Sequence, residues 1–559
     1  MGYITYGIKK ASHSVSNSIR KMKSSPDYVR FFLEGEYTDL RESKQNFIRR
    51  KIKKPKQNLQ ELCEQIEQVA NDHRVKGMIL VIRPDLQLSI AQIQQLRDTL
   101  HNSRLKGKKI ISYSYRYNTN TYYLASLADR ILLQPGGEVT PLGLKTGSMF
   151  FKAALDRLGI EMQMYNVTPY KSAADAMTKT TMTEEVKKMN NWLLDSIYDE
   201  ILTAISKGRK ISLDEAKYAI DNSPYTDVKA KKAKIIDKVL NEEQIYSYLN
   251  ETEGKKITIK NFKEAQKSLL RPAPKRAKDY IALIKVEGNI IDGKSSNPLF
   301  NFPIPILGGQ KVGDITVVDQ VRKAQSDKRA KAAVIYIDSG GGSATSSEAM
   351  ASAIRELSKK KPVVAVMSSV AASGGYYVAT AADWIIAQPS TVTGSIGVIT
   401  GKVVNKKMLE KLLLNYESIT RGENVEMSEG ANRFSKVQEE KVKESLFRIY
   451  DVFLDRVVDG RSMLKEEVEK IAGGRVWTGK QAYEKGLVDD LGGLETALRK
   501  IYNLTSLDST TPVKEIPFKK EQFKEPLPTT ASMLNLALED LKKLEGCNLY
   551  ASPMLWVKK

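Results

Sequence analysis

The chain has 559 residues, of which 41% are hydrophobic, and it is long enough for several domains with a large buried core. Its net charge is +22, which suggests an anionic partner such as nucleic acid or a membrane surface, although a genome-wide bias toward lysine gives the same excess. The two cysteines, Cys63 and Cys547, form no CxxC motif and have no histidine beside them. This argues against a disulfide framework or a zinc site and for a reducing compartment, and no cofactor is expected.

Residues 1–26 are a basic segment for which we expect an amphipathic helix. The segment has no acidic residue, and its apolar residues recur at spacings of three or four, namely Ile4, Ile8, Ala11, Val15, Ile19 and Met22. Such a helix can lie on an anionic membrane surface; the alternatives are a frayed terminus and a helix docked on the protein itself. No apolar run is long enough to span a bilayer. We therefore expect a peripheral membrane location on an unknown side, with a cytoplasmic location as the alternative.

The rest of the chain contains one domain twice. The string YYLASLADRILLQP begins at Tyr122, and YYVATAADWIIAQP begins at Tyr376. A second pair of strings, SIYDEIL and RIYDVFL, is separated by nearly the same distance. We therefore predict a first repeat over 27–265, a second repeat over 266–505 and a C-terminal extension over 506–559.

Within the second repeat, short apolar strands alternate with amphipathic helices. The expected strands are 280–288, 332–338, 362–368 and 384–388, and the expected helices are 317–327, 346–360, 374–383 and 403–414. Continuous apolar strands of this length are typical of a parallel sheet that helices cover on both faces, so we predict an α/β fold. Ligands bind such sheets beyond the carboxyl ends of strands, and the glycine-rich elements 338–343 and 373–375 lie there.

The two copies differ at these strand ends. The second copy reads DSGGGS at 338–343, AASGGYY around Ser373 and TGSIG around Ser395. The first copy has lost these glycines and has Thr119 where the second has Ser373. It has instead Lys171, in VTPYKSAADAMT, and the corresponding part of the second copy has no lysine. The copies are therefore complementary in their reactive side chains.

A serine hydroxyl needs a proton acceptor to become a nucleophile. The histidines of the chain are His13, His73 and His101, all in its first fifth, so a histidine base is poorly supplied. Lysine can accept the proton where burial lowers its pKa, and glycine N–H groups can hold an oxyanion. We predict a site of Ser373 and Lys171 located where the two copies face each other.

Each of these signals has a structural alternative when it stands alone. A Ser-Gly-Gly after a strand is commonly a turn, and a lone lysine is commonly a solvated surface residue. GGGS after a strand is often a helix entry with Ser343 as its cap. Their occurrence together, in complementary halves of a duplication, favours the catalytic interpretation.

With these motifs the chain resembles the long, duplicated form of the signal peptide peptidase A family, peptidase family S49. The resemblance covers about 27–505 and implies two tandem α/β domains with a ClpP/crotonase-like fold, a ββα-superhelix. It implies a serine endopeptidase in which Ser373 is the nucleophile and Lys171 is the general base. The N–H groups of Gly341 and Gly374 are implied as the oxyanion hole. The residues that line the site are then Gly342, Gly375 and Ser395.

The chain departs from the family pattern at two places. Family members usually read Asn-Ser-Pro-Gly-Gly-Ser in the glycine loop, whereas Asp338 and Gly340 stand here in place of the Asn and the Pro. Long-form bacterial relatives generally begin with a membrane-spanning segment, and here the chain begins with the basic segment 1–26.

The resemblance also implies a substrate class and an assembly. It implies a homotetramer with its active sites inside, which degrades cleaved signal peptides and other short, apolar, unfolded peptides at or near a membrane. The rival interpretations are a crotonase-like acyl-CoA enzyme and a non-catalytic membrane-associated scaffold. No recognisable motif points to nucleic acid.

Overall fold

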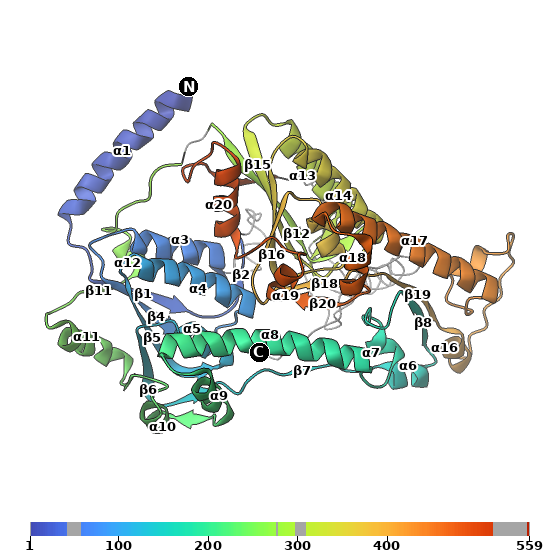
Figure 1. Cartoon of the computed structure of the whole chain (residues 1–559), viewed down its shortest axis with the longest axis horizontal. Coiled ribbons are helices and arrows are strands. Elements are labelled where there is room, and N and C mark those ends of the chain that lie inside the picture. The colour runs from blue at the N-terminus through green and yellow to red at the C-terminus, as the bar shows by residue number, and fades with distance from the viewer. Residues whose placement is uncertain (1, 42–56, 276–277, 297–308, 518–555, 558–559) are drawn as a thin grey trace. The chain divides into compact units, whose positions relative to one another are not determined.

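A computed structural model describes residues 2–41, 57–275, 278–296, 309–517 and 556–557 (Figure 1). The chain divides into two compact units. Unit 1 comprises Met1–Lys145, Asp195–Lys278 and Lys558–Lys559, and unit 2 comprises Thr146–Leu194 and Asp279–Val557. This division does not follow the predicted repeats, because residues 146–194 of the first repeat belong to the unit that holds the second. Residues 518–555 of the predicted C-terminal extension lie outside the described residues.

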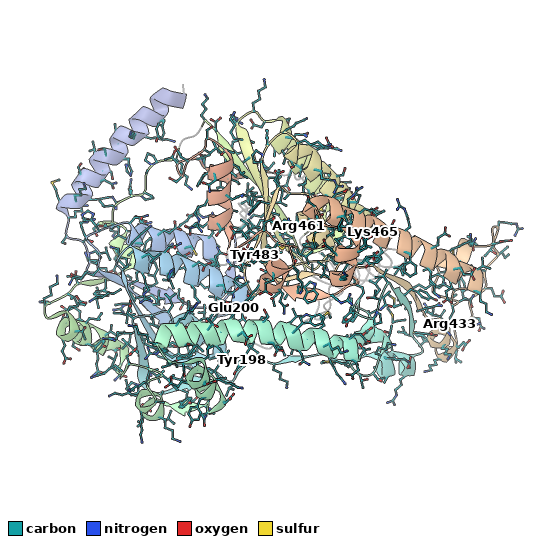
Figure 2. The ribbon with its side chains drawn as sticks, viewed as in Figure 1. Tyr198, Glu200, Arg433, Arg461, Lys465 and Tyr483 are labelled. Atoms are coloured by element: carbon teal, nitrogen blue, oxygen red, sulfur yellow. The ribbon has the colours of Figure 1, made fainter. Side chains whose placement is uncertain are left out.

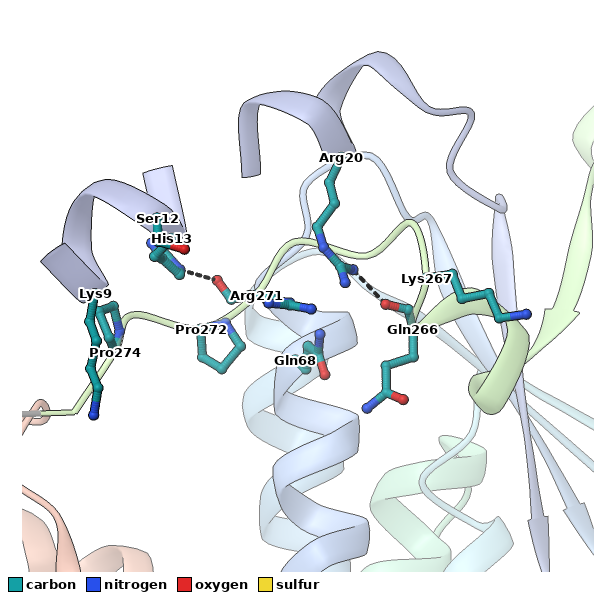
Figure 3. Close-up of a pocket in the computed structure, with 10 residues that line it drawn as sticks. All are labelled: Lys9, Ser12, His13, Arg20, Gln68, Gln266, Lys267, Arg271, Pro272 and Pro274. Carbon is teal, nitrogen blue, oxygen red and sulfur yellow. Dashed lines mark hydrogen bonds between the residues drawn. The ribbon is translucent and has the colours of Figure 1, made fainter. Parts of the chain in front are cut away.

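The N-terminal helix α1 (Gly2–Met22) forms where the sequence predicts it and docks within unit 1 through its polar face. His13 Nε2 and Asn17 Nδ2 donate to the carbonyl oxygen of Arg271 at 2.9 and 3.1 Å, and the Arg20 guanidinium donates to the carbonyl oxygen of Gln266. A cavity of about 810 Å³ lies between the helix and the segment 266–274 (Figure 3).

The apolar face of α1 points away from these contacts. The exposed fractions of Val15, Ile19 and Met22 are 60%, 47% and 80%. These residues share one face because spacings of four and three residues are close to one helical turn. Docking on the protein therefore uses the polar side chains, and the apolar face stays uncovered. None of the helices that the structure describes is long and apolar enough to cross a membrane.

Unit 1 is built on a seven-stranded sheet. Six of its strands are parallel neighbours in the order β10–β6–β5–β4–β1–β11, and the seventh, β9, pairs antiparallel with β6. The strands are β1 (Tyr28–Leu33), β4 (Gly77–Ile82), β5 (Lys109–Asn118), β6 (Arg130–Thr140), β9 (Tyr225–Thr226), β10 (Lys238–Val239) and β11 (Ile259–Asn261). Every residue of β4 is buried, with Met78 and Leu80 in one apolar cluster and Ile79 and Val81 in another. Alternate side chains therefore enter cores on both faces of the sheet.

Helices cover both of these faces. The pair α3 (Leu59–Ala70) and α4 (Ile90–Leu105) lies side by side (Figure 1) and contributes Leu59, Ile66 and Ile93 to the first cluster. Helix α11 (Ile245–Glu253) contributes Ile245 and Leu249 to the second. The Asn58 and Ser89 side chains cap the first two helices by accepting from Glu61 N and Gln92 N, as the preference of Asn and Ser for this position predicts.

Unit 2 repeats this architecture. Its eight-stranded sheet runs β20–β18–β16–β15–β12–β22, and β17 pairs with β16 and β21. The strands are β12 (Tyr280–Glu287), β15 (Ala330–Ser339), β16 (Val363–Ala372), β17 (Trp384–Ala387), β18 (Val392–Gly394), β20 (Val476–Thr478), β21 (Asp490–Leu491) and β22 (Val513–Glu515). The path β22–β12–β15–β16–β17–β21 corresponds strand for strand to β11–β1–β4–β5–β6–β10 of unit 1. The predicted α/β fold and its duplication are confirmed, and the second sheet continues past residue 505 to β22.

Most predicted elements of the second repeat form as expected. The predicted helices correspond to α13 (Asp314–Ser326), α14 (Ala344–Ser358) and α15 (Gly374–Ala379). The prediction of one helix over 403–414 is wrong. Val403 and Val404 belong to strand β19 (Ile399–Val404), and α16 covers only Lys406–Lys411. Strand β19 pairs antiparallel with β8 (Glu161–Asn166), and this long-range pairing satisfies a β-branched run that has low helix propensity.

Each repeat contains a long helix that ends at an arginine paired with an aspartate of the same repeat. These helices are α8 (Glu184–Arg209) and α17 (Lys436–Arg461), and their last arginines pair with Asp237 and Asp489 through Nη1–Oδ2 distances of 3.0 and 2.8 Å. Figure 2 labels Arg461 and shows it at the end of α17. The preceding residue is a glycine in both helices. A Cβ atom on Gly208 would lie 1.9 Å from Ser126 O, and one on Gly460 would lie 2.2 Å from Thr380 O.

We expect Gly460→Ala to destabilise unit 2, although alanine favours a helix over glycine by about 1 kcal/mol. The added Cβ would overlap the Thr380 carbonyl oxygen, and relief requires a backbone shift that costs roughly 2–3 kcal/mol. Urea unfolding of the variant and of the wild type measures this loss. The control is Gly7→Ala in α1, where no atom lies within 4 Å of the added Cβ. Equal unfolding midpoints for Gly460→Ala and the wild type would contradict the prediction.

Candidate active site

Ser373 lies at the corner between strand β16 and helix α15. The strand ends at Ala372, the helix begins at Gly374, and the serine between them is fully buried. Its φ and ψ are 56° and −118°, a conformation that non-glycine residues rarely adopt and that costs of order 1–3 kcal/mol. A hydrogen bond from Ser373 N to Gly394 O at 2.8 Å helps to hold this corner.

The two glycines after Ser373 are required by close contacts. A Cβ atom on Gly374 would lie 2.6 Å from Ser347 Oγ and 3.2 Å from Gly341 Cα. A Cβ atom on Gly375 would lie 2.5 Å from Ser339 O. The start of α15 is therefore pressed against the glycine loop after β15, which brings the backbone N–H groups of both elements to one place.

Lys171 lies in the loop that follows β8. Because β8 pairs with β19, this loop is held beside the segment that precedes β19, and Val167 N donates to Val398 O at 3.3 Å. The loop is also fixed from within, since Lys171 N donates to Thr168 O at 3.1 Å and Asn166 Nδ2 donates to Lys171 O at 3.1 Å. Lys171 and Ser373 therefore meet inside unit 2, although they come from different sequence repeats.

The Lys171 amine contacts Ser373 directly. Its Nζ lies 2.7 Å from Ser373 Oγ and donates to the carbonyl oxygen and Oγ of Ser395, both at 3.0 Å. All three side chains are fully buried. Burial lowers the pKa of the Lys171 amine well below its ordinary value, because an ammonium ion in the interior loses its hydration. The neutral amine is thereby favoured, and a neutral amine can accept a proton from a hydroxyl.

Ser395 has an unusual backbone conformation of its own. Its φ is 52°, and its N–H donates to Arg475 O at 2.7 Å. Both hydrogen bonds that it accepts come from the same amine, so Ser395 fixes the direction in which Lys171 Nζ points.

The glycine loop of 338–343 places one N–H group differently from the prediction. The N–H of Gly341 donates to Ser339 Oγ at 3.1 Å and is therefore not a free donor. The N–H of Gly342 has no acceptor among the residues that the structure describes. Gly342 N lies 3.3 Å from where a Cβ atom on Gly374 would stand. Of the two N–H groups, the geometry therefore favours that of Gly342 over the predicted Gly341 as a second oxyanion donor beside Gly374.

Asp338, Ser343 and Thr119 each have a structural partner. The Asp338 carboxylate accepts from Val370 N at 3.1 Å, which ties the end of β15 to β16. Ser343 Oγ accepts from Ser346 N at 3.3 Å and caps α14, as the structural alternative for this motif predicts. In unit 1, Thr119 begins α5 (Thr119–Ala125) at the position equivalent to the Ser373 corner, and its Oγ1 donates to Gly143 O at 3.1 Å.

The segment 472–477, which none of the sequence motifs singled out, packs against the backbone of Lys171. A Cβ atom on Gly474 would lie 2.6 Å from both Cα and Cβ of Lys171. The segment begins AGGR in the second copy and IDN in the first, so the loss of glycines that singled out 373–375 is visible here as well. The described residues contain no cluster of side chains that would hold a metal ion.

Comparison with known proteins places the chain in one family. A family model described as Peptidase family S49 matches residues 102–256 and 355–508. The plant protein "Serine protease SPPA, chloroplastic" from Arabidopsis thaliana is 33% identical over 449 residues, which are 79% of this chain and 65% of that protein. "Protease 4" from Haemophilus influenzae is 29% identical over 497 residues, 86% of this chain and 77% of that protein. "Protease 4" from Salmonella typhi is 28% identical over 473 residues, 80% and 72%.

The two matched regions fall one in each repeat and together cover more than half of the sequence. This confirms both the duplication and the resemblance that the motifs suggested. The chain therefore belongs to peptidase family S49, and it is a serine protease.

Proposed function

We propose that the chain is an endopeptidase whose nucleophile is Ser373 and whose general base is Lys171. The observation that carries the proposal is the 2.7 Å contact between the buried Lys171 Nζ and Ser373 Oγ. Burial disfavours the charged form of the amine, which lies within hydrogen-bond reach, so the hydroxyl can pass its proton to the amine as it attacks. The same contact argues against a crotonase-like acyl-CoA enzyme, whose chemistry needs no amine at this serine.

The reaction follows from these positions. Ser373 Oγ attacks the peptide carbonyl carbon while Lys171 Nζ takes the hydroxyl proton. The oxyanion of the tetrahedral intermediate accepts from the N–H groups of Gly374 and Gly342, each worth roughly 3 kcal/mol of barrier. The protonated Lys171 then gives its proton to the departing amine, which leaves an acyl-enzyme on Ser373. Lys171 next takes a proton from water as the water oxygen attacks the acyl carbon, and it gives this proton to Ser373 Oγ as the bond between Oγ and the acyl carbon breaks and the acid leaves.

The proposed substrates are short, apolar, unfolded peptides, cleaved signal peptides among them, processed by a homotetramer at or near a membrane. The substrates and the tetramer rest on the family resemblance. Exposed apolar side chains in 412–419 of unit 2, where Leu413 and Ile419 are 89% and 94% exposed, support an assembly that covers them. The exposed apolar face of α1 supports peripheral association with a membrane.

Replacing either member of the dyad is expected to abolish cleavage. We expect Ser373→Ala and Lys171→Met to lower kcat/KM on an apolar fluorogenic peptide by at least about 10³-fold, because each removes a group that acts in the transition state. The matched control is Lys108→Met in unit 1, a buried lysine whose Nζ donates to the carbonyl oxygens of Asp72 and Val75. Wild-type activity in either dyad variant would overturn the proposal.

The pH dependence of cleavage reports the charge of Lys171. The base must be unprotonated, so kcat/KM is expected to rise with pH through the pKa of Lys171 and then reach a plateau. Because burial lowers this pKa, the rising limb lies well below the pKa of an ordinary lysine, about 10.4. A plot of log kcat/KM against pH measures the limb. A limb centred near pH 10.4 is incompatible with a base that burial keeps neutral.

Membrane association through residues 1–26 is tested by charging the apolar face of α1. We expect Ile19→Asp to weaken binding to phosphatidylserine-containing vesicles by roughly tenfold. The substitution removes apolar area that the bilayer would bury, and it adds a negative charge that the anionic lipid repels. Vesicle co-sedimentation measures the change. The control is Ile315→Asp on α13, since Ile315 is 52% exposed and Ile19 is 47% exposed. Equal loss of binding in both variants, or none in Ile19→Asp, would remove α1 as the anchor.

A further inference from the structure

Three aromatic rings and two cations form a stack beside the dyad, which we call the aromatic column. Its members in order are Arg475, Tyr170, Trp192, Trp477 and Lys485. The Arg475 guanidinium carbon lies 4.2 Å from the centre of the Tyr170 ring, which is 6.1 Å from the centre of Trp192. The two tryptophan rings are stacked at 4.8 Å and 16°, and Lys485 Nζ lies 4.4 Å from Trp477. All five residues belong to unit 2.

The column joins two parts of the sequence that are far apart. Tyr170 and Trp192 come from the segment 146–194, while the other three members come from 475–485. Hydrogen bonds fix the tryptophan in place, since Trp192 Nε1 donates to Val476 O at 2.8 Å and Gln481 Nε2 donates to Trp192 O at 2.9 Å. Aromatic pairs of this kind stabilise the fold beyond the area they bury, and cations over rings add to this stabilisation.

The same segment reaches the reactive groups through its backbone. Gly474 packs on the backbone of Lys171, as the 2.6 Å distance from its ideal Cβ to Lys171 Cα indicates. Arg475 O accepts from Ser395 N, and Gly474 N donates to Ile396 O, both at 2.7 Å. One face of 472–477 therefore supports Lys171 and Ser395, and its side chains Arg475 and Trp477 enter the column.

We propose that the aromatic column is the positioning device for the general base: it clamps the loop of Lys171 between Trp192 and the segment 472–477, so that the amine stays dry and aimed at Ser373. The proposal rests on the dyad proposed above and adds Tyr170, Trp192, Arg475 and Trp477 as positioning residues. Tyr170 connects the column to the loop of the base, because it precedes Lys171 and its ring lies between Arg475 and Trp192.

The charges around the amine make the pH profile a specific readout. Burial is the cause of the lowered pKa of Lys171, and its amine is bonded to the two neutral serines Ser373 and Ser395. The charged residue of the supporting segment, Arg475, directs its guanidinium to the Tyr170 ring and to Ala472 O. Loosening the loop admits water to the amine, and hydration raises its pKa toward the ordinary value.

The test compares Tyr170→Ala with Tyr170→Phe in the full chain, on the same fluorogenic peptide. We expect Tyr170→Ala to lower kcat by roughly 10- to 100-fold with KM within about twofold of wild type, because displacing a reacting group by about 1 Å costs of this order. Its rising pH limb moves to higher pH. Tyr170→Phe keeps the ring and is expected to restore both kcat and the limb. Arg475→Lys, which loses planar stacking but keeps the charge, is expected to shift the limb in the same direction by less.

Phe262→Ala is the control for a merely structural effect. Phe262 stacks on Phe31 at 5.4 Å in unit 1, so its removal is expected to lower the unfolding midpoint and leave the pH limb unchanged. Activity that survives Ser373→Ala would overturn the dyad itself. Dyad-dependent activity with a wild-type kcat and limb in Tyr170→Ala would overturn the column alone. A change confined to KM in Tyr170→Ala would assign the Tyr170 ring to peptide binding and would also overturn the positioning role of the column. If Tyr170→Ala does not fold, an unshifted pH limb in Arg475→Lys would overturn that role.

Discussion

The fully buried amine of Lys171, 2.7 Å from Ser373 Oγ, is the constraint on which the rest of unit 2 depends. An ammonium ion in a protein interior costs several kcal/mol, so burial favours the neutral amine, which can accept a proton. Two consequences follow for the surroundings. The amine's hydrogens need acceptors that carry no charge, and Ser395 supplies two. Water must also stay out, and this requires close packing around a loop that has little regular structure of its own.

The duplication explains how such a loop is supplied. Both repeats build the same sheet, but the segment after β6 in the first repeat leaves unit 1 and joins unit 2, where β8 pairs with β19. That pairing sets the loop of Lys171 beside Ser395 without any help from the first repeat's own strand ends. The first copy has no glycine at 83–88 or 118–123, and Thr119 occupies the place of the serine, with its hydroxyl donating to Gly143 O. One repeat thus carries Ser373, and the other carries Lys171.

How much was predictable depends on whether a feature is local. The strands of the second repeat, the N-terminal helix and the pairing of Ser373 with Lys171 follow from apolar periodicity and from the asymmetry between the copies. The strand β19 was missed because its partner β8 lies more than two hundred positions away in the sequence. The choice between the Gly341 and Gly342 N–H groups could not be made from the sequence, since it depends on the position of the Ser339 hydroxyl, which accepts from Gly341 N. Gly474 was within reach, because its glycine pair is present in one copy only.

The geometry at the dyad is held by backbone more than by side chains. Ser373 and Ser395 both have positive φ angles, which disfavour any residue with a Cβ, and each N–H is bonded to the next segment: Ser373 N to Gly394 O, and Ser395 N to Arg475 O. These bonds connect Ser373, through the TGSIG turn, to the segment that carries Gly474. The aromatic column adds a side-chain link, because it ties 472–477 to Tyr170, the residue before Lys171. Ser373, the TGSIG turn, the segment 472–477 and Lys171 are therefore joined in one closed series of contacts.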